Sequence, residues 1–207
     1  MISLGVLVSG GGTNLQAILD AIEKEKLDAR VRVVVSNKAG AGGLERAARA
    51  SVPSVVVDHK AHASREAFDH AVVDTLRAHG VEWVVLAGFM RIVTPVLLSA
   101  FPMRVVNIHP ALLPSFPGVD AQRQAFEHGV RVTGCTVHLV DSGTDTGPIL
   151  AQRAVPVLEG DDVESLKARI LVAEHALLPE VLQWIAEGRV KVDTGAGRAR
   201  VRVTVGN

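Results

Sequence analysis

Short valine-rich runs separated by amphipathic segments restrict the fold of this chain more than any other feature. The first five runs lie at Ile2–Val8, Val31–Val35, Val55–Val57, Val84–Ala87 and Val105–Ile108. The amphipathic segments between the first four are Thr13–Lys26, Leu44–Ala50 and Arg65–His79. Near-continuous apolar runs are typical of parallel strands that are buried on both faces. We therefore predict an α/β fold with a doubly wound, mostly parallel sheet and helices on both faces.

The pattern changes after Ile108. Pro110, Pro114 and Pro117 exclude regular helix from the next ten residues. Val132–Val140 alternates like a strand, and Ile149–Val157 follows it without an intervening helix. Two strands in direct succession predict an antiparallel C-terminal portion of the sheet.

Two helices and a tail complete the predicted architecture. Asp120–His128 is a candidate short helix with Asp120 as its N-cap. Asp161–Glu187 predicts the longest helix, with Pro179 as a candidate kink. Its apolar stripe consists of Ile170, Leu178, Leu182 and Ile185. We expect one catalytic domain over residues 1–187 and a tail over 188–207, compatible with an edge hairpin around Gly195–Gly197.

Composition narrows the class of protein. The 207 residues contain 22 basic and 22 acidic side chains, and only 3% are aromatic. Nothing therefore points to a nucleic-acid or membrane partner, and the amino terminus does not resemble a signal peptide. The single cysteine, Cys135, excludes an internal disulfide, and the eight histidines lack metal-ligand spacing. We expect a cytoplasmic protein without a metal, as a monomer or a homodimer.

A glycine-rich loop lies between the first strand and the first helix. Its residues are Ser9-Gly10-Gly11-Gly12-Thr13-Asn14. Glycines allow close approach of a ligand, and the following helix directs N–H groups and its positive dipole end toward the loop. Leu15 replaces the third glycine of a dinucleotide fingerprint, so a phosphate or other anion is favoured. The alternative is a tight turn in which Thr13 caps the helix.

A second candidate site is Asn107-Ile108-His109-Pro110, at the end of the fifth strand. Asn107 and His109 are two residues apart, so both side chains project from one side of an extended chain. An amide can hold a developing oxyanion while an imidazole moves a proton, which suits acyl transfer. A carboxylate close to His109 is expected to raise the pKa of its imidazole. The alternative is a structural histidine bonded to a buried carbonyl.

Three acids are candidates for further roles. Asp145, with Asp141 as second choice, lies in a turn-rich loop and could supply the carboxylate for His109. The alternative is that both aspartates only cap turns. Glu174 falls between Ile170 and Leu178 on or beside the apolar stripe, where it either binds a substrate amine or hydroxyl or forms a salt bridge. Periodicity alone favours the salt bridge.

Motifs over nearly the whole chain carry a family resemblance. They read VLVSGGGTNLQAI, VVSNKAGAGGLERA, ASREAFD, VVLAGFMRIVTP, VVNIHPALLPSFPG, GCTVHLVD, GTDTGPIL and AEHALLP. The chain resembles the phosphoribosylglycinamide formyltransferases, folate-dependent enzymes of purine biosynthesis with the formyltransferase fold. In this sequence Gly11 stands where members often have a polar residue.

The resemblance implies a role for individual residues. Asn107, His109 and Asp145 match the catalytic residues, and Glu174 matches the acid that receives the glycinamide ribotide. The loop that holds the ribotide phosphate matches Gly12, Thr13 and Asn14. Positions that contact the formyl-folate match Arg65, Met90, Arg91, Ile92 and Val93, together with Asn107, Asp141 and Asp145. A cis bond of the family matches Leu113–Pro114.

The implied reaction transfers the formyl group of 10-formyltetrahydrofolate, a co-substrate, to the amine of 5-phosphoribosylglycinamide. The runner-up is formyltetrahydrofolate deformylase, which would be expected to carry an added N-terminal domain, whereas the first predicted strand here starts at Ile2. Methionyl-tRNA formyltransferase carries an extra RNA-binding domain that the short tail cannot replace. A catalytically silent phosphometabolite sensor would have no need for Asn107, His109 and Asp145 together.

Overall fold

The computed structural model describes residues 1–193 and 200–203. The chain divides into two compact units, Met1–Asn107 and Ile108–Asn207. Among the described residues, no helix combines the length and the apolar character that a membrane crossing requires.

The strands of the first unit lie close to the predicted runs. They are β1 (Ile2–Val8), β2 (Ala29–Ser36), β3 (Ser54–Val56), β4 (Trp83–Leu86) and β5 (Val105–His109), which crosses the boundary of the units. The pairs β1–β2, β1–β4, β2–β3 and β4–β5 are all parallel. Val6, Leu7 and Val8 of β1 are completely buried, as expected for a strand covered on both faces.

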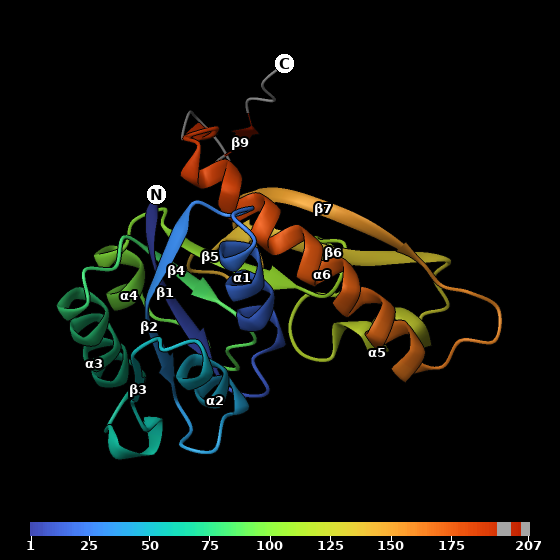
Figure 1. Cartoon of the computed structure of the whole chain (residues 1–207). Helices are drawn as coiled ribbons and strands as arrows, with labels where there is room; N and C mark the ends of the chain where they lie inside the picture. Colours follow the sequence, from blue (N-terminus) through green and yellow to red (C-terminus); the bar gives the residue numbers. More distant parts are fainter. Residues whose placement is uncertain (194–199, 204–207) are drawn as a thin grey trace. The chain divides into compact units, whose positions relative to one another are not determined.

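Helices cover both faces of the sheet in the first unit. They are α1 (Thr13–Glu23), α2 (Gly42–Arg49), the 3-10 helix η1 (His59–Ala61), α3 (Arg65–Ala78) and α4 (Pro95–Ala100). α1 contacts α2 and α3 contacts α4, and the two pairs lie on opposite faces (Figure 1). Right-handed crossovers require this, because the chain moves outward from β1 through β2 to β3 and then returns to β4.

The short helix α4 is absent from the sequence prediction. It has only six residues, too few for an apolar period to show. Its start is nevertheless well defined, because the Thr94 side chain accepts a hydrogen bond from the Val96 N–H and Pro95 occupies the first turn.

The second unit combines an antiparallel strand pair with a long helix. Its elements are α5 (Ala121–Glu127), β6 (Val132–Leu139), β7 (Ile149–Pro156), α6 (Val163–Ala186), β8 (Val190–Asp193) and β9 (Arg200–Val203). β6 and β7 pair antiparallel, as predicted, and α6 packs along both strands (Figure 1). The four predicted stripe residues of α6 are buried. They supply the core between helix and strands.

The strands β1 to β7 follow the hydrogen-bonded order β3-β2-β1-β4-β5-β6-β7. This is the predicted α/β class, a mostly parallel sheet with an antiparallel end. β8 pairs antiparallel with β9, whereas the expected turn at Gly195–Gly197 lies outside the described residues. The division of the chain after residue 187 stays a prediction.

Asp120 does not cap α5 as predicted. It occupies the N-cap position with φ 56° and ψ 36°, in the left-handed region, and forms no capping hydrogen bond. A side-chain cap requires extended backbone at this position. The Asp120 carboxylate instead accepts a hydrogen bond from Arg123 Nε at 3.0 Å.

Candidate active site

The glycine loop is anchored by the residue that precedes it. Ser9 Oγ donates to Asn37 Oδ1 at 2.6 Å and accepts from the Met90 N–H at 2.8 Å. Ser9 and Asn37 are both buried, where a hydroxyl and an amide need such partners. These bonds tie the loop to the residues that follow β2 and β4. A dinucleotide site has an acidic residue near the end of the second strand. Here Asn37 follows that strand and anchors the glycine loop instead.

Gly12 ends the loop in a conformation that favours glycine. It is the N-cap of α1, with φ 70° and ψ 32°, and no side chain caps the helix. A Cβ atom at Gly12 would lie 2.6 Å from the Gly43 Cα of α2. Thr13 is the first helical residue, so the alternative in which Thr13 caps α1 is wrong. Asn14 is buried one residue further on.

The residues matched to formyl-folate contacts in the first unit lie around α3. Arg65 is the first residue of α3, whose N-cap Ser64 accepts a hydrogen bond from the Ala67 N–H at 3.1 Å. The guanidinium of Arg91 lies 5.3 Å from the centroid of the Phe68 ring in the same helix. The structure thus brings this part of the segment beside α3.

The other side chains of the Met90–Val93 segment differ in their exposure to solvent. The side chains of Met90 and Ile92 are exposed, whereas Val93 is buried. The following residue is held firmly, because the Thr94 N–H donates to the buried Asp69 carboxylate at 2.6 Å. Two large apolar side chains therefore remain on the surface of an anchored segment.

The structure brings Asp145 to His109, as the sequence predicts. Asp145 Oδ2 lies 3.3 Å from His109 Nδ1, and the histidine side chain is only 4% exposed. The other ring nitrogen, Nε2, donates to the Phe116 carbonyl oxygen at 2.8 Å, since a carbonyl can only accept. Both ring nitrogens of His109 thus face oxygen acceptors, an arrangement that suits an imidazolium.

A second imidazole faces the same carboxylate. His138 Nε2 lies 3.6 Å from Asp145 Oδ1, and His138 Nδ1 donates to the Leu139 carbonyl at 2.8 Å. The Gly118 N–H donates to Asp145 Oδ2 at 2.8 Å. The carboxylate is therefore held by three groups from different parts of the second unit. Sequence reasoning missed His138; its only signal was its place at the end of a strand that leads into the Asp141 loop.

Burial and charge act in opposite directions on this pair. Desolvation lowers the pKa of the His109 imidazole, and the Asp145 charge and the Phe116 carbonyl offset this only in part. The Asp145 carboxylate thus acts on the His109 pKa in the predicted direction, but burial outweighs it and the net pKa is lowered. Burial raises the pKa of Asp145, but the His138 side chain, the Gly118 N–H and the His109 charge together hold it below its usual value.

Asp141 has a different environment from Asp145. Its Oδ1 accepts hydrogen bonds from the Gly143 N–H at 3.1 Å and from Thr146 Oγ1 at 2.7 Å. Asp141 thus caps a turn, whereas Asp145 faces the imidazoles of His109 and His138. Because Asp141 orders the loop, it contributes to the position of Asp145 whatever else it contacts.

Glu174 is buried on α6 near Cys135 of β6. Desolvation and the Glu174 charge raise the pKa of the Cys135 thiol to about 12. Cys135 is therefore a buried thiol and not a thiolate nucleophile, as predicted. The predicted cis peptide bond between Leu113 and Pro114 is also present. Among the described residues, no cluster of three or more potential metal ligands occurs.

Comparison with known families agrees with this geometry. Residues 3–182 match the family described as formyl transferase. The chain belongs to the formyl transferase family. The phosphoribosylglycinamide formyltransferase of Escherichia coli strain K12 is 44% identical over 191 residues, which cover 92% of this chain and 90% of that protein.

A longer relative contains a region similar to this formyl transferase. The trifunctional purine biosynthetic protein adenosine-3 of Chironomus tentans is 48% identical over 192 residues. The match covers 92% of this chain but only 14% of that protein. The chain therefore spans a small part of such relatives and nearly all of the bacterial one.

Solved structures share the fold. Glycinamide ribonucleotide transformylase 1 from Symbiobacterium toebii superposes with a TM-score of 0.95 at 56% identity, covering 99% of this chain and 95% of that one. Phosphoribosylglycinamide formyltransferase from Anaplasma phagocytophilum gives a TM-score of 0.91 at 39% identity, covering 100% and 95%. This agreement confirms the predicted fold class and the resemblance to the phosphoribosylglycinamide formyltransferases.

Proposed function

We propose that this formyl transferase moves the formyl group of 10-formyltetrahydrofolate to the amine of 5-phosphoribosylglycinamide in purine biosynthesis. The contact of 3.3 Å between His109 Nδ1 and Asp145 Oδ2 carries the proposal, because it joins two residues matched to the catalytic set. Similarity to proteins named for this reaction supports the choice of substrates. The folate is a co-substrate, and the proposed transfer uses no metal.

The proposed reaction forms one bond, breaks another and moves one proton from the amine to the leaving nitrogen. The ribotide amine attacks the formyl carbon, a new C–N bond forms, and the bond from that carbon to the folate nitrogen breaks. The Asn107 amide donates to the formyl oxygen as it gains charge. The leaving folate nitrogen gains a proton, which His109 supplies as an imidazolium. The neutral imidazole then takes up the proton that the amine loses, which restores the imidazolium. Asp145 stabilises the positive charge on the ring.

Proton delivery requires His109 to exchange one contact. In the structure Nε2 is bonded to the Phe116 carbonyl and Nδ1 faces Asp145. Because the carboxylate stabilises the imidazolium, the Phe116 contact is the one to be released toward the substrate. The lowered pKa of His109 makes the imidazolium a better proton donor once it has formed.

The remaining predicted residues bind the two substrates in this proposal. Glu174 receives the ribotide, while formyl-folate contacts Arg65, the Met90–Val93 segment and Asp141, as well as Asn107 and Asp145. The glycine loop, with Gly12, Thr13 and Asn14, binds the ribotide phosphate. The helix dipole and the first N–H groups of α1 favour an anion there.

The experiment is a spectrophotometric assay of tetrahydrofolate formation with purified protein. We expect turnover that depends on both glycinamide ribotide and formyl-folate. Asn107→Ala and His109→Ala should each lower kcat by about 10²–10³, the usual effect of removing one group that stabilises developing charge. Circular dichroism checks that both variants are folded. Wild-type turnover by folded His109→Ala would contradict the proposed role of the histidine.

The same assay, together with calorimetry, separates the competing activities. A deformylase would release formate without the ribotide amine, so formyl release in its absence would favour hydrolysis over transfer. A phosphometabolite sensor would bind the ribotide in calorimetry and would show no binding of formyl-folate. Either result would replace the proposed transfer reaction.

A further inference from the structure

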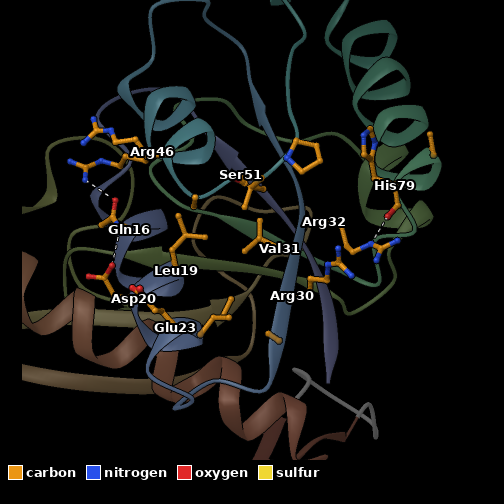
Figure 2. Close-up of a pocket in the computed structure, with 17 residues that line it drawn as sticks. Gln16, Leu19, Asp20, Glu23, Arg30, Val31, Arg32, Arg46, Ser51 and His79 are labelled. Carbon is orange, nitrogen blue, oxygen red and sulfur yellow. Dashed lines mark hydrogen bonds between the residues drawn. The ribbon is translucent and has the colours of Figure 1, made fainter.

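A groove lies between α1, α2 and the first residues of β2 in the first unit. Its volume is about 1040 Å³, with apolar residues such as Leu19 and Val31 on its walls and arginines around it (Figure 2). One of these arginines, Arg46 of α2, also reaches the glycine loop.

Arg46 is held at two points. Its Nε donates to the Gly11 carbonyl oxygen at 2.7 Å, and its Nη1 donates to Gln16 Oε1 of α1 at 3.1 Å. Gln16 Nε2 in turn donates to Asp20 Oδ1 at 2.7 Å. The bonds from Arg46 to Gln16 and from Gln16 to Asp20 are visible in Figure 2. The guanidinium is therefore a fixed bridge between the loop and the helix that follows it.

The bond to Gly11 controls the direction of the next N–H group. In a trans peptide the carbonyl and the following N–H point in opposite directions. When Arg46 holds the Gly11 oxygen, the Gly12 N–H must point away from Arg46. We propose that Arg46 is a positioning residue of the anion-binding loop, which presents the Gly12 N–H to the ribotide phosphate and turns the Gly11 oxygen away from it. This inference rests on the proposed function of the loop.

The loop needs such a clamp because sterics alone do not order its middle. A Cβ atom at Gly10 or Gly11 would have no heavy atom within 4 Å, and neither residue has a positive φ. The Gly10 carbonyl accepts from the Gly43 N–H at 3.0 Å, and Gly12 packs against Gly43. Arg46 supplies the hold on Gly11. All three glycines are thus positioned by α2.

The test compares Arg46→Ala and Arg46→Lys with the matched control Arg49→Ala. Arg49 lies on the same helix and lines the same groove, but its exposed side chain pairs with Glu45 and does not reach the loop. Lysine keeps the positive charge of Arg46 but lacks the rigid fork that bonds Gly11 and Gln16 together. The measurements are KM for each substrate, kcat and the melting temperature.

For Arg46→Ala we expect KM for the ribotide to rise about tenfold, as for the loss of one charge-assisted hydrogen bond. KM for formyl-folate and kcat should stay within about twofold of wild type, because no group at the formyl carbon changes. In Arg46→Lys the KM for the ribotide should remain raised, and Arg49→Ala should have the wild-type KM. A wild-type KM in Arg46→Ala, full rescue by lysine, or an equal loss in every constant would overturn the positioning role.

A second measurement does not depend on catalysis. In wild-type protein, titration with inorganic phosphate should shift the NMR amide resonance of Gly12, and Arg46→Ala should weaken that shift about tenfold in apparent affinity. If the wild-type protein transfers no formyl group but shows this difference, the positioning role stands and the proposed reaction fails. If wild-type Gly12 does not respond to phosphate, the positioning role fails even where turnover is observed.

Discussion

At the scale of single residues, His109 shows how burial and charge compete. The Asp145 carboxylate favours the imidazolium, yet the ring is 4% exposed, so the loss of hydration dominates and its pKa falls. Asp145 remains ionised because it gains donors as well as a charge. A partly buried acid that stays ionised beside a histidine of lowered pKa gives a proton site that releases its proton readily.

This balance predicts how stability depends on pH. Because the pKa of His109 in the folded protein lies below its ordinary value of 6.5, the unfolded chain binds more protons just below pH 6.5. The free energy of unfolding should therefore decrease as the pH is lowered from about 6.5 toward the folded pKa. The slope from this group is at most about 1.4 kcal/mol per pH unit. Urea denaturation between pH 7 and about 5 measures the slope.

The comparison variant is His109→Gln, which cannot bind this proton and should lose that part of the slope. The lowered pKa of Asp145 acts separately, since its contribution is present above the usual aspartate range and is lost only as pH falls through its folded value. An unchanged slope in His109→Gln, or an NMR titration of the ring above pH 6.5, would contradict the predicted direction.

At the scale of elements, the junction of β1, the glycine loop and α1 depends on its packing against α2. Gly12 combines a positive φ of 70° with backbone contact to Gly43. Ser9 fixes the other end of the loop through Asn37 and Met90. The loop is therefore ordered by neighbouring elements and not by its own composition, which is flexible.

Gly12→Ala should disrupt this junction. A left-handed backbone costs a non-glycine residue about 1–2 kcal/mol, and the new Cβ also collides with Gly43, so the free energy of unfolding should fall by more than about 1 kcal/mol. We expect a raised KM for the ribotide as well. The matched control is Gly11→Ala, which meets open space and should be neutral or slightly stabilising. Denaturant unfolding and steady-state kinetics test both, and equal effects at the two positions would refute the assignment.

At the scale of the whole molecule, the balance of charge sets behaviour in solution. Lys plus Arg and Asp plus Glu are both 22, so the formal charge is zero with neutral histidines. Proteins near zero net charge lack the repulsion that keeps molecules apart. Association at neutral pH therefore does not by itself indicate a specific oligomer.

We predict that solubility is lowest near pH 7 and rises as the eight histidines become cationic at lower pH. The exposed Lys26 offers a matched variant, since Lys26→Glu replaces a positive with a negative charge and should move the minimum to lower pH. Precipitation by polyethylene glycol as a function of pH measures both. A minimum that does not move in Lys26→Glu would show that net charge is not the controlling property.

The sequence alone determined the longer elements and most of the candidate chemical groups, because hydrophobic period and chain breakers are local properties. The valine-rich runs, the glycine loop and the stripe of α6 were readable for this reason. It also placed Asn107 and His109 on one side of a strand, since alternation is a local rule. The family motifs added specificity where single residues such as Glu174 were ambiguous.

Only the tertiary structure decided which groups meet. Asp141 and Asp145 look alike in sequence, yet one orders its own loop and the other faces two imidazoles. His138 and Arg46 meet their partners on other segments of the folded chain, and hydrophobic periodicity does not predict such contacts. The direction of the His109 pKa depends on desolvation by surrounding atoms, a property of packing density that residue spacing does not contain.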